Sequence, residues 1–236
     1  MKDLRAIVIV LAIGILAVSA YAQVPIVIND PAIETPKSPI NEADKALLDS
    51  EVLPKVRKAL VDDACTTDGF DPAGAVSGSF TKPGATQTLV FYQFCQTGNG
   101  LGQVGIAILE EGKVVGSYTA DSGWSDTVKV LPDINDNGLN EFALYYSGGM
   151  HQGEGGTGVD IMEFGTGGPK ALGWFQASAY FAEADSLGWK VTVKKRKTPV
   201  FYREKYLSSD EKKWRKAGKA AAFTLKKTEN NFVAVK

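Results

Sequence analysis

The sequence predicts a mostly β protein made of antiparallel sheets, arranged as a sandwich or as part of a propeller-like fold. Short segments rich in β-branched and aromatic residues recur from residue 86 onward, at the close spacing typical of all-β domains. Between them there is no room for the helical crossovers that a parallel sheet needs. The strands are expected at 86–95, 103–109, 113–118, 127–131, 141–147, 158–165, 171–180, 188–194 and 198–203.

The first 22 residues have the pattern of a secretory signal peptide. Lys2 and Arg5 precede an apolar run from Ala6 to Val18, and Ala20-Tyr-Ala22 is an A-x-A cleavage signal. Cleavage after Ala22 predicts a secreted or periplasmic protein with no transmembrane span in its mature form. The alternative is an uncleaved anchor, for which residues 6–22 are at the short limit.

Residues 23–40 are expected to form an extended arm or linker, because the four prolines in this stretch discourage a helix. Its apolar residues Ile26 and Ile28 suggest an edge strand, added either to this chain or to a partner. The remainder, residues 41–236, is predicted to be a single β-rich domain.

One substantial helix is expected at about residues 42–63. Asn41 can cap its start, and Leu48, Val52, Val56 and Leu60 recur at intervals of four. Pro54 predicts either a kink or a second helix that has this proline in its first turn.

The two cysteines, Cys65 and Cys95, are predicted to form a disulfide, since an even number of cysteines fits an oxidising compartment. The alternative is a pair of buried free thiols.

Charge is distributed unevenly along the chain. Residues 188–236 contain 15 Lys or Arg against 4 Asp or Glu, whereas residues 23–187 carry a net charge of −13. The basic segment is expected either to contact an anionic partner, such as an envelope polymer, or to pair with the acidic body of its own chain. Within it, Ser208-Ser-Asp-Glu211 resembles a capping box and predicts a short C-terminal helix ending at Gly218, before a closing strand pair at 220–225 and 231–235.

The stretch from Asp133 to Glu141 has the pattern of a metal-binding loop. Its first, third, fifth and ninth positions are Asp133, Asn135, Asn137 and Glu141, and Gly138 is sixth, where a tight loop favours a residue without a Cβ. Ca²⁺ prefers six to eight oxygen ligands on a flexible loop. A structural Ca²⁺ is therefore predicted, and the alternative is an Asn/Asp/Gly turn without metal.

This loop resembles the calcium loop of FG-GAP and VCBS-type repeats, which form blades of β-propellers such as that of the integrin α subunit. Asp133, Asn135, Asn137 and Glu141 match the family's ligand positions. Asparagine replaces the usual aspartate at the fifth position, and the chain has one copy of a loop that the family repeats. The resemblance implies calcium binding that is weakened by the low number of carboxylates, with a Kd of about 0.1–1 mM.

A glycine-rich stretch at residues 147–158 is expected to be a long irregular loop. His151, Gln152 and Glu154 are its candidate ligand-contact residues. Its GxGxxG pattern does not predict a dinucleotide site, because a strand rather than a helix follows.

The pattern as a whole predicts a secreted, non-enzymatic, calcium-binding β domain with a binding or scaffolding role at the cell envelope or outside the cell. The alternative is a hydrolase acting on a cell-wall or extracellular polymer, with His151 as a general base beside Glu154, Asp160 or the carboxylates of the Asp133 loop. No catalytic residue set and no oligomeric state follow from the sequence.

Overall fold

A computed structural model describes residues 24–59, 71–97, 101–151, 154–181, 184–228 and 232–236. The predicted signal peptide at 1–22 lies outside these residues. Within them, no helix has both the length and the apolar character needed to cross a membrane. Two antiparallel sheets contain most of the described chain, which confirms the predicted mostly β fold class.

The smaller sheet is formed by the first half of the chain and closed by its C-terminus. Its strand order is β14-β5-β4-β3-β2. Its hairpin between Glu110 and Lys113 has a tight turn, in which Glu111 and Gly112 both adopt positive φ, of 51° and 70°. The strands are β2 (Asp71–Gly78), β3 (Gln87–Thr97), β4 (Leu101–Glu110), β5 (Lys113–Ser122) and β14 (Val233–Ala234).

The larger sheet follows the chain from β6 to β12 in sequence order, with β1 and β13 paired beside this path. The pairing of β9 with β10 covers only Leu187–Ala179 and Gly188–Ser178, and β1 pairs with β10 farther along the strand. The strands are β1 (Ile26–Asn29), β6 (Trp124–Val130), β7 (Phe142–His151), β8 (Glu154–Gly165), β9 (Gly168–Phe181), β10 (Ser186–Lys194), β11 (Val200–Ser208), β12 (Arg215–Lys216) and β13 (Ala221–Phe223).

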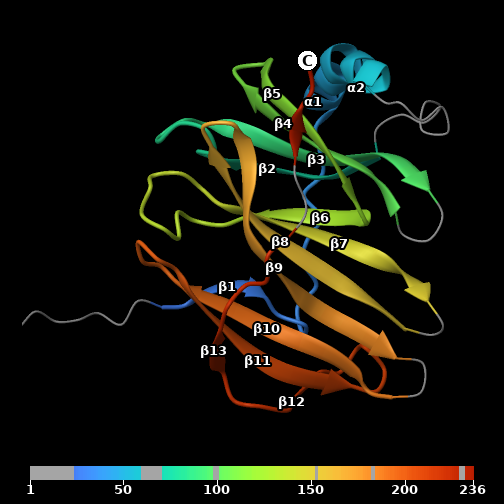
Figure 1. Cartoon of the computed structure of the whole chain (residues 1–236), viewed down its shortest axis with the longest axis vertical. Helices are drawn as coiled ribbons and strands as arrows, with labels where there is room; N and C mark the ends of the chain where they lie inside the picture. The colour runs from blue at the N-terminus through green and yellow to red at the C-terminus, as the bar shows by residue number, and fades with distance from the viewer. Residues whose placement is uncertain (1–23, 60–70, 98–100, 152–153, 182–183, 229–231) are drawn as a thin grey trace, which may run out of the picture.

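Side-chain alternation divides the interior into separate apolar cores. In β3, Leu89 and Phe91 face the larger sheet, whereas Val90 and Tyr92 face the helix. In β7, Phe142 and Leu144 pack toward the smaller sheet, while Ala143 and Tyr145 contact residues of β9 to β11. Both faces of these strands are therefore buried, and Figure 1 shows the helix on the outer side of the smaller sheet and β10 to β13 at the opposite end.

The helix is continuous but changes its hydrogen-bonding pattern. It consists of α1 (Glu42–Leu47), a π-helical turn (Leu48–Val52) and α2 (Leu53–Ala59). The Asn41 side chain accepts from the backbone N–H of Asp44 at 2.8 Å, as the capping pattern predicts. Pro54 has no N–H to donate, and the π-helical turn lies just before it. The predicted residues 60–63 lie outside the described part.

The N-terminal arm belongs to its own chain's sheet, because β1 pairs with β10. The Tyr145 hydroxyl donates to the carbonyl of Ile28 at 2.7 Å, and Asn29 Nδ2 donates to the carbonyl of Trp189 at 2.6 Å. Ile28 is fully buried. Of the two predicted positions for this edge strand, on its own chain or on a partner, the structure has the first.

The prediction of a short C-terminal helix that begins near Ser208 and ends at Gly218 is wrong. Asp210 does accept from the N–H groups of Lys212 and Lys213, at 3.0 and 2.9 Å, but this turn does not propagate. Glu211 has φ of 58°, which is outside the helical region, and residues 215–216 pair with β11 instead. The predicted closing strand pair is also wrong, since β13 joins the larger sheet and β14 the smaller one.

Removing the buried side chain of β1 tests how strongly the arm is bound. Ile28→Ala is expected to lower the free energy of unfolding by about 2–5 kcal/mol, because it leaves a cavity in the core. Ile33→Ala is the control, since Ile33 is 66% exposed, and it is expected to change stability by less than about 0.5 kcal/mol. Urea unfolding of both variants measures the difference, and equal effects would contradict an intramolecular position of the arm.

Candidate functional site

The predicted metal loop joins β6 to β7 at the edge of the two cores. The backbone N–H of Leu131 donates to the carbonyl of Glu141 at 2.8 Å and closes the loop at its base. Ile134 is fully buried inside it. The tight path is possible because Asp136 and Gly138 adopt positive φ, of 60° and 85°.

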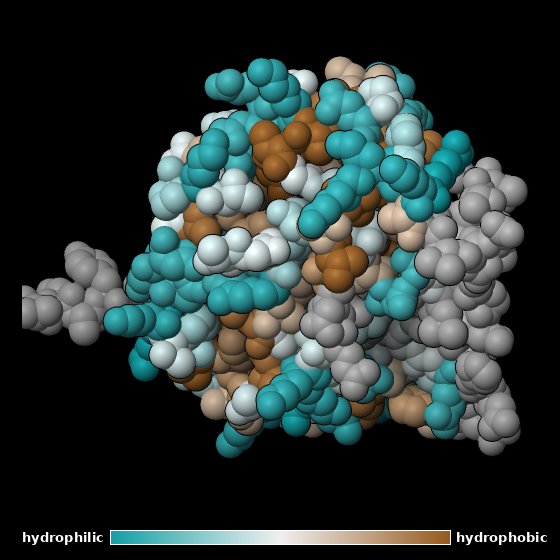
Figure 2. Space-filling model, turned by 45° about the horizontal axis from the view of Figure 1, so that its top comes forward, coloured by the Kyte–Doolittle hydropathy of each residue, from teal (hydrophilic) through white to brown (hydrophobic). Residues whose placement is uncertain are grey.

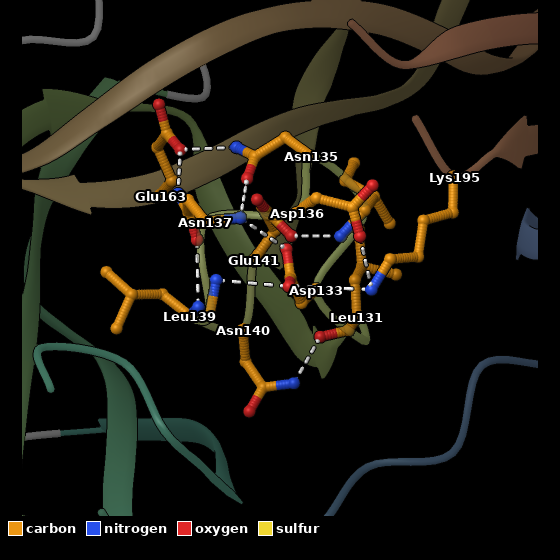
Figure 3. A network of polar contacts seen from close by, with 12 residues as sticks. Leu131, Asp133, Asn135, Asp136, Asn137, Leu139, Asn140, Glu141, Glu163 and Lys195 are labelled. Carbon is orange, nitrogen blue, oxygen red and sulfur yellow. Dashed lines mark hydrogen bonds and ion pairs between the residues drawn. The ribbon is translucent and has the colours of Figure 1, made fainter. Parts of the chain in front are cut away.

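The structure brings together the side chains of the predicted ligand residues (Figure 3). Asp133 accepts from the N–H groups of Asn137 and Gly138, both at 3.1 Å. Asn135 Oδ1 accepts from Asn137 N at 3.2 Å, and Asn137 Oδ1 accepts from Leu139 N at 2.8 Å. These short-range bonds fold the loop around its own side-chain oxygens. Although burial opposes ionisation, the two N–H donors hold the pKa of Asp133 below its usual value.

Glu141 is the most buried of the four predicted ligand residues. The residue is fully buried, and its Oε2 accepts from the N–H of Ile134 at 2.8 Å. Its other oxygen, Oε1, is buried without a hydrogen-bond partner. Burial, helped by the nearby carboxylates of Asp133 and Glu163, raises the pKa of Glu141 to about 7, although the backbone N–H groups of Ile134 and of Glu141 itself act to lower it. An ionised Glu141 therefore lacks the compensation that a buried charge requires.

Glu163 of β8 also belongs to this site, although it lies outside the predicted loop in the sequence. It is only 5% exposed, and its Oε2 accepts from Asn135 Nδ2 at 2.7 Å and from Asn137 Nδ2 at 3.1 Å. Lys170 contacts its other oxygen at 2.8 Å. An acidic residue inside the apolar run Ile-Met-Glu-Phe was the only available signal, and nothing in that signal indicates the loop as its partner.

Two further segments contact the loop. Lys195, between β10 and β11, lies 2.9 Å from Asp136 and 3.5 Å from Asp133, and Arg196 N donates to the carbonyl of Ile134 at 3.0 Å. Asn140 binds the β2–β3 connection through Ser79, whose N–H donates to Asn140 Oδ1 at 2.8 Å. The loop thus connects segments of both sheets.

The donor set fits a hard cation. The side-chain atoms available as metal ligands in this loop are all oxygens, and they come from Asp133, Asn135, Asn137 and Glu141. One of them, Oε1 of Glu141, is buried without a hydrogen-bond partner. The described residues contain no group of three or more His, Cys, Asp or Glu arranged to hold a metal. Amide oxygens are therefore necessary members of any metal site at this loop.

The predicted ligand-contact stretch forms a hairpin rather than a long irregular loop. β7 extends to His151 and β8 begins at Glu154, and these two residues are register partners. Two of its glycines allow close packing: a Cβ on Gly158 would lie 2.6 Å from the Tyr146 ring, and one on Gly156 would lie 2.4 Å from the Ser178 carbonyl. Gln152 lies outside the described residues.

His151 and the Asp133 loop lie at opposite ends of β7. Ten residues of strand separate them, which corresponds to roughly 30 Å. Asp160 is also distant from His151, since its register partner is Leu144. Of the carboxylates considered for the hydrolase, only the exposed Glu154 lies beside His151 along the backbone.

A cleft of about 360 Å³ lies between the β2–β3 connection and the β8–β9 turn. Its one carboxylate, Glu110, accepts from Gln87 Nε2 at 3.0 Å and from Lys82 at 3.0 Å, and both contacts lower its pKa. Exposed large apolar residues of the described chain are spread over several elements, and Figure 2 shows small separate apolar patches among hydrophilic residues on the face displayed. These residues are Val24, Val27, Ile33, Val115, Phe181 and Val233.

Part of the basic segment pairs with the acidic body of the chain. Lys190 binds Asp30 at 2.7 Å, and Arg215 binds Asp185 at 2.5 Å. Other cations rest on aromatic rings, and these are Lys194 on Tyr202, Arg203 on Trp189 and Lys226 on Trp174. The contact with an external anionic partner remains a prediction.

The predicted disulfide involves one described residue. Cys95 is buried on the helix side of β3, with 4% exposure. Cys65 lies outside the described residues, so the Cys65–Cys95 bridge remains a prediction.

Comparison with known proteins gave no match among family models, curated proteins or solved structures. The resemblance to FG-GAP and VCBS-type repeats therefore rests on the loop residues alone.

The raised pKa of Glu141 predicts a pH dependence of stability in chelator. The unfolded chain releases this proton near its ordinary value of 4.5, whereas the folded protein retains it until about pH 7. The proton on Glu141 should therefore stabilise the folded state fully below about pH 4.5. This stabilisation should decrease as the pH rises to about 7 and be absent above that pH. Urea unfolding of wild type and Glu141→Gln across this range measures the contribution, which should vanish in the variant. Parallel pH profiles would show that Glu141 is not perturbed.

Proposed function

We propose that residues 133–141 bind a structural Ca²⁺ and that the chain is a secreted, non-enzymatic β protein with a binding or scaffolding role. The buried Oε1 of Glu141 carries the calcium proposal, because a carboxylate oxygen without a partner in the interior requires either a proton or a cation. The folded loop, the neighbouring carboxylate of Asp133 and the all-oxygen donor set support a hard divalent cation.

Asp133, Asn135, Asn137 and Glu141 would hold the ion, which would supply the positive charge that this anionic loop lacks. The backbone N–H bonds to Asp133, Asn135 and Asn137 preorganise the side chains, so little conformational entropy remains to be lost on binding. The contacts of Asn140 and Arg196 would transmit this stabilisation to the β2–β3 and β10–β11 connections.

The binding or scaffolding role and the secreted location rest on the sequence pattern of residues 1–22 and on the type of site. A metal placed to brace a loop between two sheets would support the fold rather than a reaction. The hydrolase alternative gains no support from the geometry, because His151 lies far from both the Asp133 loop and Asp160.

A thermal melt of residues 23–236, in chelator and then with about 2 mM free Ca²⁺, tests the calcium proposal. With a Kd of about 0.1–1 mM, binding should stabilise the folded state by about 0.6–1.8 kcal/mol and raise the melting temperature by roughly 1–7 °C. The double variant Asp133→Ala, Glu141→Gln is expected to lose this rise.

Asp136→Asn is the matched control within the same loop. Asp136 is 55% exposed and its carboxylate contacts Lys195, so this variant should retain the calcium-dependent rise. A wild type that melts at the same temperature in chelator and in Ca²⁺ would reduce the loop to a turn without metal.

Lys195→Gln is expected to increase calcium affinity by about two- to tenfold. The Lys195 ammonium lies 3.5 Å from Asp133 Oδ2 and reduces the negative potential that attracts the cation. Isothermal titration calorimetry at low and high salt measures the change, which should shrink as salt screens it. An unchanged or reduced affinity would indicate that Lys195 supports the loop rather than competing with the ion.

A further inference from the structure

We propose that Glu163 is the positioning residue of the calcium site and that it supplies, from β8, the negative charge absent from loop positions 135 and 137. This inference rests on the proposed calcium function. It assigns to Glu163, which lies outside the loop in the sequence, a role in how tightly the loop binds calcium.

The first observation is that one carboxylate oxygen binds both amides. Glu163 Oε2 accepts from Nδ2 of Asn135 and from Nδ2 of Asn137, at 2.7 and 3.1 Å. Because an amide nitrogen cannot bind a cation, fixing each Nδ2 on Glu163 also fixes each Oδ1 on the other side of its amide. Those oxygens accept backbone N–H groups within the loop, as a folded ligand loop requires.

The second observation explains why asparagine occupies these positions. An aspartate at 135 or 137 would place a carboxylate oxygen about 3 Å from Glu163, where two ionised groups repel strongly. Asparagine at both positions and glutamate at 163 are therefore complementary. With Glu163, three carboxylates belong to the ligand cluster, rather than the two (Asp133 and Glu141) among the four predicted ligand residues.

The third observation is that Glu163 is held in place independently of the amides. It is 5% exposed, and Lys170 of β9 binds its Oε1 at 2.8 Å. Because a buried charge in a fixed position contributes a stronger field than an exposed one, Glu163 is suited to attract a cation as well as to orient the ligands.

Calcium titration calorimetry of wild type, Glu163→Gln and Glu163→Gln with Asn135→Asp tests the proposal. Glu163→Gln should weaken calcium binding by about threefold to tenfold, since it removes one charge beside the amides. Adding Asn135→Asp returns the charge to the loop and should restore the affinity to within about twofold of wild type. Glu154→Gln is the matched control, because it removes an exposed carboxylate at the other end of the same strand, and its affinity should equal that of wild type.

Melting each variant in chelator establishes that it is folded. Should Glu163→Gln not fold, Asn135→Asp alone carries the test. It places two carboxylates side by side and should lower the calcium-free melting temperature while giving a larger calcium-induced rise than wild type. An equal rise would contradict the proposal.

The outcomes separate this proposal from the calcium site itself. If wild type binds Ca²⁺ and Glu163→Gln binds it equally well, the role of Glu163 is wrong and the site stands. If Glu163→Gln binds weakly and Asn135→Asp does not restore binding, Glu163 does not act through the asparagines and the proposal is also wrong. If wild type binds no Ca²⁺, the calcium function fails and this inference with it.

Discussion

Burial of both faces of the central hairpin is the constraint on which the rest of this structure depends. Alternate residues of β7 and β8 enter two different apolar cores, so both faces of the hairpin are buried at residues 142–145 and 159–164. Any polar side chain that these strands carry must find its partners inside the protein. Glu141 and Glu163, at the loop-proximal ends of this hairpin, are such residues.

The loop satisfies one of these carboxylates and not the other. Glu163 has three donors, one from each of two asparagines and one from Lys170, which compensate its burial. Glu141 has the N–H of Ile134 on one oxygen only, and the carboxylates of Asp133 and Glu163 disfavour its ionised form. The asymmetry between these two buried carboxylates identifies where a positive charge is missing.

Much of the fold was predictable because it is encoded locally. The alternation of apolar residues predicted most of the strands, and Asn41 with the four-residue spacing of Leu48, Val52 and Val56 predicted the helix. The C-terminal segment was predicted incorrectly, because its capping pattern competes with pairing to β11, and local sequence does not contain that tertiary contact. The glycine-rich stretch was misjudged for the same reason, since its glycines accommodate the Tyr146 ring and the backbone of β9.

The candidate site also includes a tertiary contact that local sequence could not predict. Asp133, Asn135, Asn137 and Glu141 lie within nine residues, so their spacing alone indicates a shared loop. Glu163 follows 22 residues after Glu141 and reaches the loop only because β8 pairs with β7 in a particular register, with Phe142 opposite Met162. A shift of that register by one residue would turn Glu163 to the other face of the sheet. The charge of the site is therefore a property of strand pairing, and the number of acidic residues in the loop underestimates it.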